Sequence, residues 1–147
     1  MNQNNPFYKF LTAEDKEHVR FVEHLERLHK DVLWFHVPNE GKKTAFERYK
    51  SSIMGVKKGA SDFIFLHPKY NEAGETLFHG LIIELKAPEY KRIVLKGKKA
   101  GAVVKVKKGE LSEEQVIFLR RSNEKRYKAT CCFGCEESIE VLNQYLK

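Results

Sequence analysis

Short apolar runs alternate along the chain with segments whose apolar residues recur at helical spacing, a pattern typical of mixed α/β proteins. Two runs, 59–66 and 80–86, are introduced by Gly and are rich in β-branched and aromatic residues, as buried strands are. Further strands are predicted at 32–37 and 127–133. The turn residues of 68–75 favour an antiparallel hairpin joining the first two runs.

Helix start signals lie between these strands. Thr12 can cap a first helix, and the sequence from Ser112 to Gln115 has the pattern of a capping box at the start of another. A last helix is predicted over 138–146, and 43–54 is either helical or irregular. The expected order of elements gives a central mixed sheet with helices on its faces.

The length of 147 residues and the apolar fraction of 41% fit a single globular domain, 1–147, with a full core. Apolar runs stay far below the length of a membrane span. Residues 1–6 are polar and show no signal-peptide pattern. We therefore expect a cytoplasmic protein, or one of the host cytoplasm or nucleus if the chain is viral.

The formal net charge of +7 favours a polyanionic partner. Between Lys91 and Lys108 there is no acidic residue, and this segment lies in a predicted basic insertion at about 89–109, folded as a hairpin from 93 to 106. It is either a solvated loop or an arm that contacts phosphates. The expected DNA-contacting residues are Lys57, Lys58, Lys91, Arg92, Lys96, Lys98, Lys99, Lys105, Lys107 and Lys108.

The cysteines, Cys131, Cys132 and Cys135, are odd in number, which argues against a disulfide framework. A zinc site would need a partner such as a histidine from elsewhere in the chain. We expect instead that Cys131 is a small buried strand residue and that Cys132 points to the other face.

Candidate chemistry comes from charged residues inside the predicted strands. Asp62 lies in the first of the two runs, and Glu84 and Lys86 lie in the second. Charges are costly in buried strands unless they are paired or bind a metal. Because Glu84 and Lys86 are two residues apart, their side chains leave the same face of the sheet. Two carboxylates beside an ammonium group suit a hard cation and an activated water.

Four segments, in this order along the chain, resemble the PD-(D/E)XK nuclease superfamily, and within it the virus-type replication–repair nuclease (VRR_NUC) domain. The first contains a Pro-Asn turn, the second ends in the aspartate, the third is the Glu-x-Lys strand and the fourth is a Ser-x-x-Gln helix start. They are Phe35-His-Val-Pro-Asn-Glu-Gly41, Gly55-x-x-x-Gly59-Ala-Ser-Asp62, Ile83-Glu-Leu-Lys86 and Leu111-Ser-Glu-Glu-Gln115.

The resemblance implies a stand-alone, restriction-endonuclease-like domain with an αβββαβ core. It also implies a Mg²⁺ or Mn²⁺ ion held by Asp62, Glu84, the Leu85 carbonyl and Glu17. Lys86 would orient the attacking water or offset charge on the transition state, and Gln115 would hydrogen-bond near the water or the phosphate.

Some positions depart from the family or stay open. Ser61 stands where the family usually has proline. Glu14 and Glu23 compete with Glu17 for the acidic place on the first helix. Asn39 is first a turn former, and His36 is expected to be structural or DNA-contacting.

The stand-alone form of this family resembles Holliday-junction resolvases, which implies a homodimer acting on four-way DNA junctions in recombination and repair. The alternatives are a flap or nicking nuclease of the same fold, and a DNA-binding module without catalytic activity. Incubation with Mn²⁺ and branched DNA distinguishes them.

Overall fold

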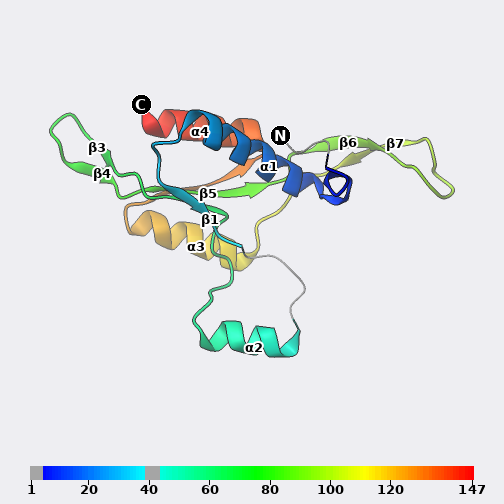
Figure 1. The fold of residues 1–147 in the computed structure, drawn as a ribbon, viewed down its shortest axis with the longest axis horizontal. Helices are drawn as coiled ribbons and strands as arrows, with labels where there is room; N and C mark the ends of the chain where they lie inside the picture. The colour runs from blue at the N-terminus through cyan, green and yellow to red at the C-terminus, as the bar shows by residue number, and fades with distance from the viewer. Residues whose placement is uncertain (1–4, 39–43) are drawn as a thin grey trace. The chain divides into compact units, whose positions relative to one another are not determined.

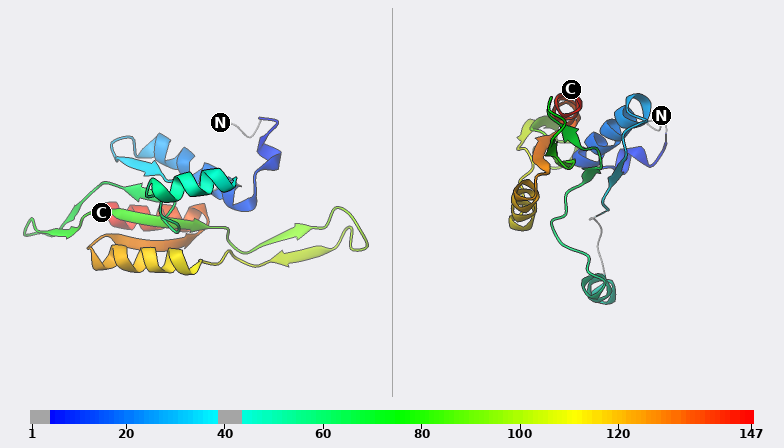
Figure 2. Two further views of the ribbon diagram at one scale, coloured as in Figure 1. Left: turned by 90° about the horizontal axis from the view of Figure 1, so that it is seen from below. Right: turned by 90° about the vertical axis from the view of Figure 1, so that its left-hand side faces the viewer.

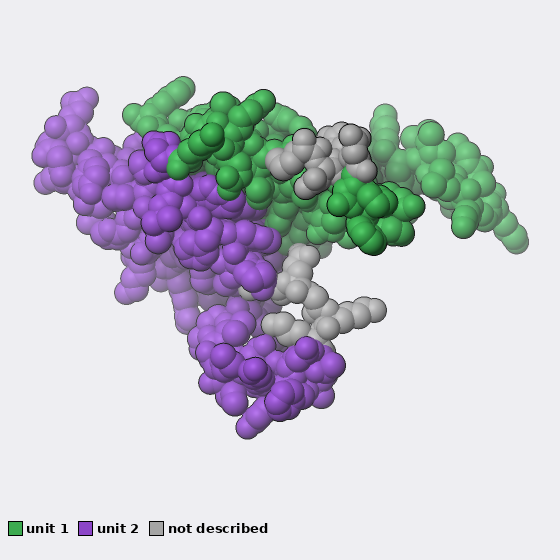
Figure 3. All heavy atoms as spheres, viewed as in Figure 1, with its two compact units in different colours: residues 1–30, 85–110, 131–147 green, residues 31–84, 111–130 purple. Residues whose placement is uncertain are grey.

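The computed structural model describes residues 5–38 and 44–147, and the chain divides into two compact units, coloured in Figure 3. The chain passes from one unit to the other inside two strands of the central sheet. Each unit is described by itself. Unit 1 consists of Met1–Lys30, Leu85–Glu110 and Cys131–Lys147, and unit 2 of Asp31–Glu84 and Leu111–Thr130.

The central sheet has the strand order β1-β2-β5-β8 (Figure 1). Strand β1 pairs antiparallel with β2, and β2 pairs antiparallel with β5. Strand β8 runs parallel to β5, because the Lys128 amide donates to the Gly80 carbonyl and, six residues on, the Gly134 amide donates to the Lys86 carbonyl. The bounds are β1 Trp34–His36, β2 Phe63–Phe65, β5 Leu81–Lys86 and β8 Lys128–Phe133.

Every residue of β5 is buried, which explains why its sequence is a nearly continuous apolar run and does not alternate. On β2, the side chains of Phe63 and Phe65 are fully buried, whereas Ile64 between them is partly exposed. The apolar core of unit 2 therefore lies along the pairing of these two strands.

Unit 2 also contains α2 (Ala45–Ile53), α3 (Glu113–Glu124) and a small hairpin of β3 (Lys69–Tyr70) and β4 (Thr76–Phe78). Helices α2 and α3 both begin with a capping box. The hydroxyl of the N-cap accepts from the amide three residues on, and the side chain at that position accepts from the N-cap amide. The α3 capping box confirms the helix start predicted from the sequence.

In unit 1, α1 (Ala13–Leu28) packs against α4 (Cys135–Leu146). Phe21 and Leu25 of α1 and Leu142 of α4 are fully buried. A short 3-10 helix, η1 (Tyr8–Phe10), precedes α1. Thr12 caps α1 as predicted, and Asp15 completes its capping box.

The remainder of unit 1 is a two-stranded ribbon, β6 (Tyr90–Ile93) and β7 (Val103–Val106), whose strands lie side by side in Figure 2. Lys91 lies opposite Lys105 in the ribbon's register. The Gly109 amide donates to the Ala87 carbonyl at 2.9 Å. This hydrogen bond joins the two ends of the ribbon segment, which we call the neck of the ribbon.

The predicted fold class, a mixed α/β sheet with helices in the αβββαβ order, is confirmed. Details differ. The 68–75 segment contains a strand of its own, β3. The ribbon begins at Tyr90 and not at residue 93, and the last helix begins at Cys135 and not at residue 138. Among the described residues, no helix combines the length and apolar character that crossing a membrane requires.

The prediction for the cysteines was wrong. Cys132 is the fully buried residue of β8, and Cys131 is partly exposed. Burial raises the pKa of the Cys132 thiol to about 12, with a further contribution from Glu137, and burial raises that of Cys135 to about 11. The raised pKa values mean that both thiols are protonated in the metal-free chain at neutral pH.

Candidate metal and phosphate site

The register of β2 against β5 brings two predicted acidic residues together. Phe63 lies opposite Ile83 and Ile64 opposite Ile82, so the same register continued by one pair places Asp62 opposite Glu84. Directly opposite residues of an antiparallel pair share a face, with Cβ atoms about 4.5–5.5 Å apart. Both side chains are buried. The two carboxylates therefore leave the same face of the sheet in unit 2.

Gln115 joins this pair from α3. Its side-chain amide donates a hydrogen bond to Oε1 of Glu84, while its Oε1 accepts from the Ser112 amide in the capping box. The capping role of Gln115 and its contact with the predicted site are thus both present. The helix start fixes the amide in the orientation that lets its nitrogen reach the carboxylate.

A cavity of about 790 Å³ in unit 2 opens beside these residues. Asp62 and Gln115 contribute to its wall, and Lys57 and Lys58, two of the predicted DNA-contacting residues, line it as well. The other lining residues come from α2, from the segment that follows it and from the α3 N-terminus: Arg48, Tyr49, Ser51, Ser52, Val56, Gly59, Ala60 and Ser112.

Gly59 sets how closely this segment approaches α3. Its φ is +75°, in the left-handed region that favours glycine, and a Cβ on it would lie 2.5 Å from the backbone carbonyl carbon of Glu114. Only a residue without a side chain fits there. This contact places Lys57 and Lys58 next to the first turn of α3.

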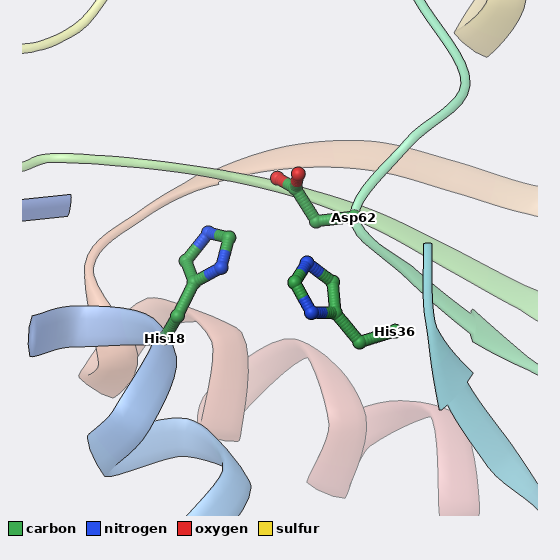
Figure 4. A group of neighbouring side chains, drawn as sticks. All are labelled: His18, His36 and Asp62. Atoms are coloured by element: carbon green, nitrogen blue, oxygen red, sulfur yellow. The ribbon is translucent and has the colours of Figure 1, made fainter. Parts of the chain in front are cut away.

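His36 is a neighbour of Asp62 that the sequence analysis did not include in the site. It ends β1, its ring stacks on that of Phe63, and the Val37 amide donates to the Asp62 carbonyl. Figure 4 labels His36 and Asp62, whose ligand atoms lie within 4.8 Å of each other. A carboxylate and an imidazole are donors that fit Mn²⁺, and carboxylate oxygens suit Mg²⁺.

Ser61, where the family usually has proline, is fully buried, and its hydroxyl has no hydrogen-bond partner within 5–38 and 44–147. An unpaired buried hydroxyl carries a desolvation cost. The departure from the family pattern therefore affects stability at this position, whereas the carboxylate beside it is retained.

In unit 1, Lys86 is paired with an acidic residue of α1. Its Nζ lies 3.5 Å from Oε1 of Glu14, and Oε2 of Glu14 accepts from the Ala87 amide at 3.1 Å. Glu84 and Lys86 are two residues apart on β5, so local strand geometry sends both side chains to the same side.

Glu17, the predicted metal-shell residue of α1, contacts the start of α4. Its Oε2 accepts from the Cys135 amide at 2.7 Å, at the start of α4, and it forms an ion pair with Arg20. The N-cap of α4 is Gly134, which has no side chain to cap the helix. The Glu17 carboxylate supplies that cap. Glu23, the third competitor, lines a separate cavity beside Arg27.

The Leu85 carbonyl, a further predicted ligand, lies 3.4 Å from Nε2 of His18 on α1. His18 is labelled in Figure 4 and is a second residue that the sequence analysis did not single out. Asn39 and the rest of the Pro-Asn turn after Pro38 lie outside the described residues. Neither His18 nor His36 gives a spacing signal in the sequence, because the residues around each come from other elements.

The remaining predicted DNA-contacting residues lie in or next to the ribbon of unit 1. One of them, Lys105, forms an ion pair with Glu89 at 2.9 Å, and another, Lys108, lies over the ring of Phe133. Those with exposed side chains are Lys91, Arg92, Lys96, Lys98, Lys99, Lys105, Lys107 and Lys108.

Comparison with known proteins agrees with this architecture. No family model matches the sequence, and no curated protein matches it. The structure is similar to a solved structure described as "VRR_NUC domain protein", with a TM-score of 0.65 and 21% sequence identity, covering 92% of this chain and 89% of that one. This chain has the fold of a VRR_NUC domain protein, as its sequence motifs predicted.

Proposed function

We propose that this chain is a metal-dependent endonuclease that hydrolyses phosphodiester bonds in DNA. The observation that carries the proposal is the cross-strand pair of Asp62 and Glu84, with Gln115 donating to Glu84. The likeness to a VRR_NUC domain protein supports it, since a virus-type replication–repair nuclease is what the sequence motifs resemble.

Asp62 and Glu84 would hold the ion, with His36 beside them. The bound ion supplies Lewis-acid activation of the phosphate and a more acidic water. Gln115 holds the Glu84 carboxylate in place, so that its orientation does not depend on the ion alone. Lys86, held by Glu14, provides a positive charge that offsets the charge developing on the phosphate.

The proposed substrate is a branched duplex such as a four-way junction, contacted through its phosphates by the ribbon. A run without acidic residues from Lys91 to Lys108 suits contacts that read backbone shape more than sequence. Symmetric cutting of a junction needs two sites, so we propose a homodimer with two-fold symmetry. A flap or nicking activity of the same site is the alternative within this class.

The test compares cleavage of a four-way junction, a flap and a linear duplex, each with Mg²⁺, with Mn²⁺ and with EDTA. We expect metal-dependent products, most from the junction. The Asp62→Asn variant should give none, whereas Asp31→Asn, which changes an exposed aspartate of the same unit, should cleave as the wild type does.

Binding of the junction without any product at high enzyme concentration would refute the nuclease proposal and favour a DNA-binding module. Preferred cutting of the flap would keep the nuclease and reject the junction. Sedimentation of the protein with and without junction DNA tests the homodimer separately.

A further inference from the structure

Helix α2 presents one side to the cavity beside Asp62 and buries none of its residues, Ala45–Ile53. Helices shorter than about 12–15 residues are only marginally stable in water on their own, and α2 has 9 residues. Its cavity-lining residues are spaced as one side of a helix is. They are Arg48, Tyr49, Ser51 and Ser52.

The charges along this cavity suit a phosphodiester strand. Arg48, Lys57 and Lys58 line it, and Asp62 is the acidic residue among the described lining residues. Glu114 lies nearby on α3. Hydrogen bonds from its own backbone amide and from the Ser112 hydroxyl lower the pKa of Glu114, and Lys58 adds to this effect. Between the start of α2 and Asp62, the basic side chains still outnumber the carboxylates.

Tyr49 gives the cavity an aromatic wall. Its side chain is 62% exposed, and it lines the same cavity as the cations Arg48 and Lys57. An aromatic ring beside a positively charged groove is the arrangement by which proteins bind single-stranded nucleic acid, since bases stack on the ring while the phosphates contact the cations. The volume of about 790 Å³ lies within the usual range of ligand sites.

We propose that this cavity binds unpaired nucleotides of the DNA strand next to the scissile phosphate, with a base stacked on Tyr49 and phosphates on Lys57 and Lys58. The proposal rests on the nuclease function proposed above and names its substrate class more closely. Bases of an intact duplex are covered by their neighbours and offer no free face to the ring. The cavity therefore selects DNA that is unpaired beside the cut, such as a flap or an opened branch point.

The experiment measures binding of fluorescein-labelled single-stranded dT₂₀ and of a matched 20-base-pair duplex by the full chain. Ca²⁺ replaces Mg²⁺ so that no cleavage is required. We expect Tyr49→Ala to weaken single-strand binding about 5- to 100-fold and to change duplex binding less than about twofold. Tyr49→Phe, which keeps the ring, should restore single-strand binding.

The matched control is Tyr70→Ala, which removes a similarly exposed tyrosine (57%) from β3 of the same unit, outside the cavity lining. It should leave both affinities unchanged. Lys57→Ala should weaken single-strand binding and lower the slope of log affinity against log salt by about 0.7. Sedimentation checks that the mass of Tyr49→Ala equals that of the wild type.

The proposal is overturned if Tyr49→Ala leaves single-strand binding intact, if it weakens duplex binding equally, or if it changes the mass, which would make α2 an interface between copies. Failure of the nuclease proposal looks different. In that case wild-type protein gives no cleavage with Mn²⁺, while the effect of Tyr49→Ala on binding in Ca²⁺ persists.

Discussion

The ammonium group of Lys86 lies 3.5 Å from a carboxylate oxygen of Glu14, and the second oxygen of the same carboxylate accepts a hydrogen bond from the Ala87 amide. The acid on α1 thus binds both the side chain of Lys86 and the backbone that follows it. Because Lys86 is buried, this pair holds its nitrogen in one place.

Lys86→Ala should lower the cleavage rate about 10²–10³-fold, the usual effect of removing one group that stabilises transition-state charge. Junction affinity should change little, because other cations supply the phosphate contacts. Glu14→Gln should lower the rate less and also spare binding. Rates come from single-turnover cleavage and affinities from fluorescence anisotropy in Ca²⁺. Lys125→Ala, which removes an exposed lysine after α3, serves as the control. If the Lys86→Ala variant folds but loses both cleavage and junction binding, then Lys86 does not act on the cleavage step alone.

The Asp62→Asn variant, which removes a proposed metal ligand, should give no cleavage products and should bind Mn²⁺ more weakly than the wild type, as measured by isothermal titration calorimetry. In the wild type, EDTA should stop the reaction and added Mn²⁺ should restore it. His36→Ala should reduce affinity for Mn²⁺ more than for Mg²⁺, since imidazole suits the softer ion. Equal losses for both ions would show that the imidazole does not bind the metal.

Gly59→Ala should destabilise the chain and slow cleavage, because its Cβ would lie 2.5 Å from the Glu114 backbone. Gly74→Ala is the matched control: its φ is +78°, close to the +75° of Gly59, but a Cβ there would meet nothing within 4 Å. Both variants bear the left-handed strain of about 1–2 kcal/mol. The difference between their unfolding free energies, measured in urea, gives the cost of the steric overlap with α3. Equal unfolding free energies would show that α3 moves aside.

Ser61→Ala should leave stability unchanged or raise it by up to about 1 kcal/mol, since the buried hydroxyl has no partner in the described part of the chain. Ser138→Ala is the contrast. Its hydroxyl is equally buried but donates to the Gly134 carbonyl at 2.9 Å, so its loss should cost about 1 kcal/mol. Thermal unfolding of both variants gives the comparison. A clear loss of stability in Ser61→Ala would reveal a bond to the hydroxyl.

The pKa of His24 is lowered by burial, with contributions from His29 and Arg27 that outweigh Glu136. The unfolded chain therefore binds a proton on this residue at a higher pH than the folded chain does, and stability falls as the pH drops below about 6.5. We expect His24→Gln to lose less stability than the wild type between pH 7.5 and 5.5. Urea unfolding at each pH measures the unfolding free energy of both proteins. If the free energy falls equally with pH in the wild type and in His24→Gln, His24 is not the cause.

Most of the fold was predictable because its central strands are buried and their apolar runs stand out from the surrounding sequence. The four-residue ribbon strands were harder to place. Each has too few residues for a clear alternation, and the cross-strand pair Lys91 and Lys105 gives no apolar signal. The inward-facing residues of β8 were misassigned. Cys131 and Cys132 are adjacent and identical, so the sequence alone does not show which one faces the core.

The candidate site was partly predictable for a similar reason. Asp62, Glu84 and Gln115 carry local motif signals, and the structure brings them together in unit 2. Helix spacing does not decide between Glu14 and Glu17, since residues three apart share a face. Their partners differ: Glu14 contacts Lys86, whereas Glu17 caps α4. Such partners come from segments more than 70 positions away in the sequence.

The neck of the ribbon ends within two residues of Lys86, where the Gly109 amide closes onto the Ala87 carbonyl and a Cβ on Gly109 would lie 3.2 Å from the Lys86 side chain. A self-closed loop of this kind can be lengthened, shortened or replaced without altering the strands that carry Asp62 and Glu84. Changes in length or sequence beyond the neck would thus give evolution, or a protein engineer, an interchangeable module on a constant fold.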